Sequence, residues 1–190
     1  MDHNPTSSFN LYHGTTKENI MKILESEEFI FEPRVDHWLG NGVYFFEDDI
    51  DKALWWSEMT VKKLKKNINE KGILFIEGYS IKRNKLFNLD SEVDRNQLAN
   101  FLKNAQSTFN INLTSKDPEE RMIEARAIVI NLFVEYYKLS AVKYTFHKDN
   151  LKKHRFLSGL NLNNNETQFC IVDTETINFK DVRDITEEVI

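Results

Sequence analysis

Three apolar runs of the sequence each carry a polar side chain that suits ligand binding. His13 directly follows a run of aromatic and aliphatic residues and precedes Gly14, which lets a backbone approach a ligand without a Cβ in the way. Tyr44 lies in a second run, just behind two closely spaced glycines that predict a tight turn. Gln168 lies near the start of a third run. Imidazole, phenol and amide groups on three separate strands predict a cleft that binds a nucleotide.

The segments that carry these residues are His13-Gly14-Thr15, Gly40-x-Gly42-Val43-Tyr44-Phe45 and Gln168-Phe169-Cys170-Ile171-Val172-Asp173. In this order they resemble the diphtheria-toxin and poly(ADP-ribose) polymerase branch of the ADP-ribosyltransferase superfamily, and the resemblance covers most of the chain. That branch has a His-Tyr-Glu triad, and the third position here is Gln168. The resemblance implies an enzyme that uses NAD+ as its substrate, transfers ADP-ribose to a macromolecular acceptor and releases nicotinamide.

The resemblance also implies roles for residues around the nicotinamide. His13 would hydrogen-bond ribose hydroxyls, and the backbone of Gly14 would hold the carboxamide. Trp55 stands at the spacing from Tyr44 at which polymerase-like members carry an aromatic residue, so these two rings would enclose the nicotinamide. Where the family often has a serine for the carboxamide, this sequence has Lys52.

Two further residues are candidates for the phosphate groups. Thr15 begins a predicted helix whose N-terminal amides would face the cleft, an arrangement that suits phosphates. Arg34 lies in a loop that covers the bound dinucleotide in the family, and it is a candidate for the pyrophosphate. A surface loop without a ligand explains Arg34 equally well.

Cleavage of the bond between nicotinamide and ribose builds positive charge on the ribose, so the site needs a nearby anion. Gln168 keeps the acceptor oxygen of a glutamate but lacks its charge, and loss of one focused electrostatic contact costs about 10²–10³ in rate. Glu166 is two residues away and lies on the same face of an extended strand. We therefore expect Gln168 to orient the ribose and Glu166 to supply charge or activate the acceptor.

Each candidate also has a structural explanation, and for any one residue alone that explanation is the better one. His13 would then be a structural histidine, Tyr44 a core tyrosine and Trp55 a core tryptophan. The ordered set favours the site instead. Two other functions stay open: a module that binds NAD+ or ADP-ribose with little catalysis, and an RNA 2′-phosphotransferase. The phosphotransferase is disfavoured because it should require several arginines around one phosphate, and the arginines of this sequence are scattered, at Arg34, Arg121, Arg126 and Arg155.

Composition predicts one globular domain over residues 1–190. The chain has 41% hydrophobic residues and no run that approaches the roughly 18 apolar residues of a membrane span. Its start lacks a signal-peptide pattern, so we expect a soluble, cytoplasmic protein. The single cysteine, Cys170, is expected to be a buried structural thiol, and no Cys/His spacing predicts a metal site.

The acceptor stays open between protein and nucleic acid. A net charge of −5 gives no overall attraction to nucleic acid. A polar loop at residues 147–165 would either contact phosphates of an acceptor or be a solvated loop. Its basic or potentially basic residues are Lys148, Lys152, Lys153, His154 and Arg155. Small stand-alone domains of this family often serve as bacterial toxins or in defence, which would imply a neutralising partner protein.

Hydrophobic periodicity and capping signals predict an α+β fold: two packed, mostly antiparallel sheets that form the NAD+ cleft, with flanking helices. Residues 1–8 are expected to be frayed. Helices are predicted from a cap at Thr15 to about Glu27, from a cap at Asp48 or Asp49 to about Lys66, and over 91–105 and 118–138. Strands are predicted at 29–31, 72–81, 85–90 and 141–146, and an edge strand at 179–185.

Overall fold

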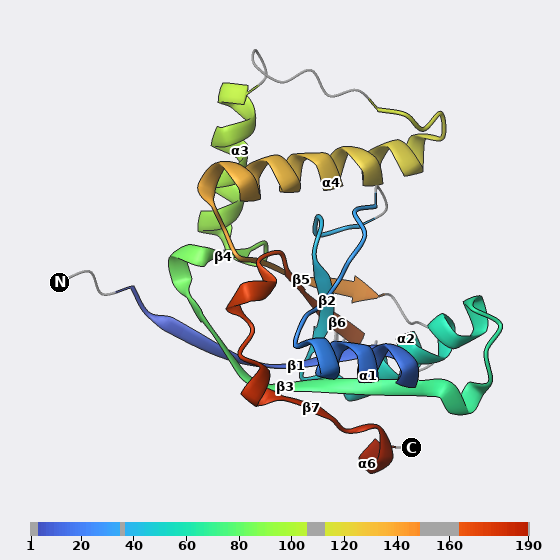
Figure 1. Ribbon diagram of the computed structural model, residues 1–190. Coiled ribbons are helices and arrows are strands. Elements are labelled where there is room, and N and C mark those ends of the chain that lie inside the picture. Colours follow the sequence, from blue (N-terminus) through green and yellow to red (C-terminus); the bar gives the residue numbers. More distant parts are fainter. Residues whose placement is uncertain (1–3, 35–36, 106–112, 149–163, 190) are drawn as a thin grey trace.

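The structure of the protein is a computed structural model that describes residues 4–34, 37–105, 113–148 and 164–189 (Figure 1). The described strands form one seven-stranded sheet. In order across the sheet they are β4 (Leu86–Asn88), β5 (Ala141–Lys148), β6 (Asn164–Ile171), β2 (Val43–Glu47), β1 (Thr6–Thr16), β3 (Lys71–Lys82) and β7 (Val182–Asp184). The helices are α1 (Lys17–Ser26), α2 (Ile50–Lys63), α3 (Glu92–Ala105), α4 (Pro118–Tyr137) and α6 (Thr186–Val189).

Neighbouring strands run antiparallel except for β4 and β5, which are parallel. The mixed helix and sheet content and the mostly antiparallel pairing agree with the predicted α+β class. The expectation of two separate sheets was wrong for the described strands. The reason is that β6 pairs with β5 along one edge and with β2 along the other, and so joins the two halves.

The sheet curls so strongly that its two halves face each other. Two strands separate β3 from β6, so a flat sheet would hold them roughly 14 Å apart. The rings of Tyr79 and Phe169 nevertheless lie only 5.7 Å apart. A bulge contributes to the bend, because Asn10 of β1 lies opposite two residues of β3, one of which is Gly78 with a φ of +65°. We call the inner side of the curl the concave face and the outer side the convex face.

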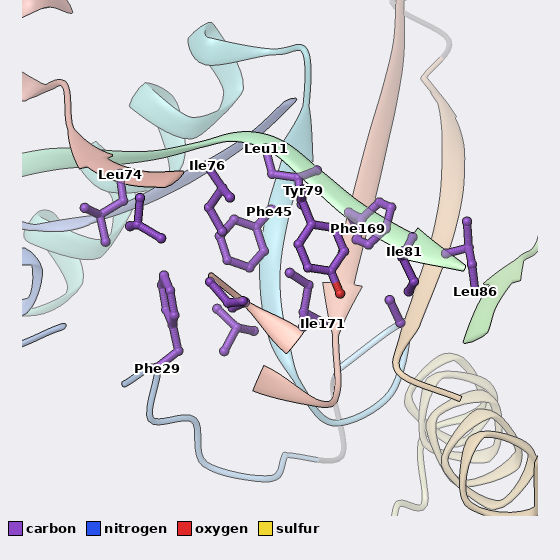
Figure 2. Close-up of a cluster of buried hydrophobic side chains, with 14 of the residues drawn as sticks. Leu11, Phe29, Phe45, Leu74, Ile76, Tyr79, Ile81, Leu86, Phe169 and Ile171 are labelled. Atoms are coloured by element: carbon purple, nitrogen blue, oxygen red, sulfur yellow. The ribbon is translucent and has the colours of Figure 1, made fainter. Parts of the chain in front are cut away.

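The concave face carries the largest hydrophobic cluster. Figure 2 shows side chains from β1, β2, β3 and β6 pointing into it, among them Leu11, Phe45, Ile76 and Phe169. Helix α1 covers this face through Ile20. Alternation along each strand sends the intervening side chains to the convex face.

Two separate helices cover the convex face. Helix α4 packs Ile130 and Phe133 against β4, β5 and β6, with Cys170 in the same cluster. Helix α2 packs Ala53 against β1, β2 and β3. Figure 1 shows α3 and α4 together at one end of the molecule, and α1 and α2 beside β1 and β3.

Most predicted elements are confirmed to within a few residues, and the differences have local causes. Residues 6–8 are not frayed, because they pair with residues 80–82 of β3. Thr16 caps α1 instead of Thr15, whose hydroxyl accepts a hydrogen bond from the Asn19 side chain. The segment at 29–31 is not a strand, since Phe29 packs into the concave cluster away from any strand partner. The loop predicted at 147–165 is shorter than expected, because β5 extends to Lys148 and β6 begins at Asn164. Its residues 149–163 lie outside the described residues.

Within the described residues, no helix is long and apolar enough to cross a membrane. The same part of the chain contains no group of three or more His, Cys, Asp or Glu side chains arranged to hold a metal ion. Cys170 is completely buried, and burial raises the pKa of its thiol far above the ordinary value. The expectation of a buried thiol at this position is confirmed.

Candidate active site

Gly14 lies where α2 presses directly on β1. A Cβ on this residue would lie 1.9 Å from the carbonyl oxygen of Ala53, which is a backbone atom that cannot move alone. One turn later, the Ser57 hydroxyl donates to the carbonyl of Thr15 at 2.6 Å and accepts from the N–H of Gly72 at 2.9 Å. The approach of α2 therefore accounts for glycine at this position. The predicted contact of the Gly14 backbone with a carboxamide stays a prediction.

His13 is held by backbone and aromatic contacts on the concave face. Its Nδ1 lies 2.8 Å from the carbonyl oxygen of Tyr44, and because a carbonyl only accepts, Nδ1 carries the proton. The ring packs against Phe45 and Phe29, with centroid distances of 5.4 and 5.8 Å. Burial lowers the pKa of His13, and the hydrogen bond to Tyr44 opposes this shift only in part. At neutral pH the ring is therefore uncharged, with a lone pair on Nε2 that can accept a hydroxyl proton.

Tyr44 lies on the opposite, convex face. Its hydroxyl donates to the carbonyl of Gly40 at 2.9 Å and accepts from the N–H of Leu39 at 2.8 Å. Its ring lies 5.1 Å from that of His37 and packs with the cluster that contains Cys170. The hydroxyl thus fixes the glycine turn that precedes β2, and the ring forms part of the surface beside β6.

Glu166, Gln168 and Lys52 form a polar cluster on the same convex face. Glu166 is 3% exposed, so its carboxylate has lost nearly all contact with solvent. The Gln168 side-chain amide donates to one carboxylate oxygen at 2.6 Å, and the Lys52 ammonium lies 3.3 Å from the other. The predicted shared face of Glu166 and Gln168 is confirmed by this contact. The buried carboxylate is thus a fixed anion inside an ion pair, with its charge balanced by Lys52 and one oxygen bound by the Gln168 amide.

Lys52 is the member of this cluster that the sequence did not predict. Asp49 caps α2 by accepting from the backbone N–H of Lys52 at 3.0 Å, which places Lys52 in the first turn of the helix. In this position its side chain reaches β6. The available signal was a cation at the position where the ADP-ribosyltransferases that the sequence resembles often have a serine.

The remaining candidates lie at the edges of this arrangement. Trp55 is 46% exposed and follows Lys52 by three residues, so the two share a side of α2. Arg34 is exposed, and its Nε donates to His37 at 3.1 Å, next to Tyr44. The structure therefore brings Tyr44, Glu166 and Gln168 onto one face, and places the His13 ring on the other.

A surface depression of the described residues lies elsewhere, under the C-terminal part of α4. Arg83, Asp94 and Phe133 are among its lining residues. The guanidinium of Arg83 is paired there with Asp94 and donates to the Leu86 carbonyl at 2.9 Å. Because its cation is already paired with Asp94, this depression offers little to an anionic ligand.

Comparison with known proteins gives one partial relative. A segment of 59 residues, 30% of this chain, is 41% identical to the uncharacterized protein MJ0359 of Methanocaldococcus jannaschii. The chain covers 28% of the length of that relative, so the likeness is local. No protein-family model matches the chain, and no solved structure matches it.

Proposed function

We propose that the protein is an NAD+-dependent mono-ADP-ribosyltransferase with its reaction centre on the convex face around Tyr44, Gln168 and Glu166. The observation that carries the proposal is the buried carboxylate of Glu166, held by the Gln168 amide and by the Lys52 ammonium. An anion fixed beside an oriented amide suits a reaction that develops positive charge on a ribose.

The hydrogen bond between Gln168 and Glu166 gives these two side chains of β6 different roles. The Gln168 Nε2 group is engaged with Glu166, which leaves the amide oxygen as the acceptor for a ribose hydroxyl. The Glu166 carboxylate then supplies the negative charge that an amide lacks. Its Lys52 counter-ion moderates that charge, so this site would be slower than one with an unpaired carboxylate.

His13 would act at the point where the pairing of β1 and β2 ends. The two strands pair at Leu11 with Glu47 and at Tyr12 with Phe46, and the imidazole then reaches across to the Tyr44 carbonyl. A bound dinucleotide would cross this point, with one ribose hydroxyl donating to the lone pair on Nε2.

In the proposed reaction, the bond between nicotinamide and C1′ of the ribose breaks, and its electron pair leaves with nicotinamide. A nucleophile of the acceptor forms a new bond to C1′ and loses a proton, which the Glu166 carboxylate can take. Trp55, on the side of α2 that carries Lys52, is the aromatic candidate for contact with the departing ring.

The test is release of nicotinamide from NAD+ by the purified protein, with and without cell lysate. We expect release that rises with lysate and falls about 10²-fold in Glu166→Gln, because that change removes the anion. His13→Ala and Gln168→Ala should also lower it. Glu25→Gln is the matched control, since Glu25 is an exposed glutamate on α1.

The same assay, together with the melting temperature, distinguishes the transferase from a second candidate function, a module that binds NAD+ or ADP-ribose without turnover. The amide of Gln168 in place of a carboxylate favours that alternative. A melting temperature that rises with NAD+ while no nicotinamide is released would select the binding module. If NAD+ causes neither release nor a shift in melting temperature, both proposals are wrong.

A further inference from the structure

The outward side of α2 carries large apolar side chains that the core does not use. The inward side is fully buried through Ala53, Ser57 and Val61. On the outward side, Trp56 and Met59 are each 44% exposed, next to Trp55. Bulky apolar side chains gathered in solvent on one helix mark a surface that meets another molecule.

Four lysines follow directly on the same helix and its end. Lys62, Lys63, Lys65 and Lys66 are all exposed, in a protein whose net charge is −5. Lys66 forms an ion pair with Glu18. For the other three lysines, the contacts between described residues include no ion pair. We call this set, with Trp55, Trp56 and Met59, the α2 surface.

Stabilisation of the helix end does not account for the whole cluster. Lys62 and Lys63 lie in the last turn of α2, where a cation favours the helix dipole. Lys65 and Lys66 lie beyond that turn, where this effect has faded. Lys65 has a φ of +54°, and the backbone N–H groups of Lys65 and Lys66 are bonded to the carbonyls of Lys62 and Val61. The turn is therefore fixed, and it presents the lysines in a defined place.

The aromatic and basic parts run along one side of the helix. Met59 and Lys62 follow Trp55 by four and seven positions, and Lys63 follows Trp56 by seven, spacings that share a helix face. The indole rings of Trp55 and Trp56 lie 6.0 Å apart at 52°, so they do not stack on each other. Figure 1 shows α2 at the periphery of the fold, away from α3 and α4.

We propose that the α2 surface binds single-stranded nucleic acid, with a base against Trp56 and phosphates on Lys62, Lys63 and Lys65. Aromatic faces beside a basic track are the features that hold single strands without reading their sequence. A duplex covers the faces of its bases, so it would use the lysines alone. A peptide of glutamates alone would also meet the lysines, but it has no planar ring for the indole to stack on.

This inference also names the acceptor class that a transferase would meet at this surface. Only that further step rests on the proposed function. Binding of the strand requires neither NAD+ nor turnover, so a binding assay and the nicotinamide assay can fail independently.

The experiment measures fluorescence anisotropy of labelled single strands of about 12 nucleotides, RNA and DNA, titrated with the protein without NAD+ over a range of salt concentrations. Three phosphate contacts predict a slope of log affinity against log salt of about −2. The triple change of Lys62, Lys63 and Lys65 to Gln should bring the slope close to zero. Trp56→Ala should weaken binding roughly 5- to 150-fold and leave the slope unchanged.

Matched control variants distinguish binding at the α2 surface from nonspecific attraction of the nucleic acid to lysines elsewhere on the protein. Lys103, Lys116 and Lys180 are exposed lysines elsewhere, and their triple change to Gln alters net charge by the same amount. Tyr136→Ala is the aromatic control, because Tyr136 is 67% exposed on α4. We expect both controls to change affinity less than about twofold.

Three results would overturn the proposal. One is the absence of single-strand binding at low salt, and another is an equal loss of binding in the control lysine variant. The third is tighter binding of a duplex or of a polyglutamate peptide than of the single strand. Circular dichroism of each variant confirms that it is folded before its affinity is compared.

Discussion

Replacing Lys52 with methionine removes the ammonium group that lies 3.3 Å from the buried Glu166 carboxylate. At this distance and an effective dielectric constant of about 20, the attraction amounts to about 5 kcal/mol. Part of that attraction is offset by the hydration that the ammonium regains on unfolding. The Lys52 side chain is 22% exposed, so we expect a net loss of about 2–3 kcal/mol in the free energy of unfolding.

Thermal and urea denaturation measure this loss. For a chain of this length the melting temperature should fall by about 5–10 °C in Lys52→Met. Lys62→Met is the matched control, because Lys62 is exposed on the same helix, and it should stay within about 0.5 kcal/mol of the parent. The Met side chain keeps most of the apolar length of Lys, so the comparison isolates the charge.

A double-mutant cycle then assigns the loss to the ion pair. In the Glu166→Gln background the buried anion is absent, so Lys52→Met should cost about 1–3 kcal/mol less than it does alone. Simple additivity of the two changes would refute the reasoning. So would a Lys52→Met protein that melts within about 1 °C of the parent, since the ion pair would then contribute nothing.

Three further predictions follow from single contacts. In Gly14→Ala, the added methyl would lie 1.9 Å from a backbone oxygen of α2, so urea denaturation should show a loss of about 3 kcal/mol in the free energy of unfolding. Gly78→Ala is the comparison: its nearest contact is at 3.3 Å and its φ is positive, so it should lose only about 1 kcal/mol. The Cys170 thiol should react with iodoacetamide at pH 8 only when the protein unfolds, because burial raises its pKa and blocks access; equal rates in the native protein and in urea would contradict this. Burial lowers the pKa of His13 below 6.5, so in mild acid the unfolded chain binds a proton that the folded chain does not. The contribution of His13 to the free energy of unfolding is therefore fully present above about pH 6.5 and is lost as the pH falls below that value. The melting temperature should decline more steeply between pH 7 and pH 5 in the parent than in His13→Gln, and parallel declines would show that the folded imidazole accepts the proton.

Local pattern was enough to predict most of the helices and strands and the shared face of two site residues. The helical stripe after Asp49 predicted α2, and the Pro118 start predicted α4. The two-residue period of an extended strand predicted that Glu166 and Gln168 share a face, which their hydrogen bond confirms. The choice of cap was missed by one residue, because adjacent threonines are equally good caps by type. In the structure the Thr16 hydroxyl accepts from the Asn19 backbone N–H, while the Thr15 hydroxyl accepts from the Asn19 side chain.

The curl of the sheet and the partners of the site residues depend on tertiary structure. The pairing of β6 with both β5 and β2 makes one curled sheet where two were expected. The register with β3 turns His13 to the concave face, while Tyr44 points to the convex face. Lys52 becomes the counter-ion of Glu166 only because α2 packs onto β1 at Gly14. The sequence by itself determined the period of each element, since sterics and propensity act over a few residues; which faces meet depends on long-range packing, which no local pattern contains.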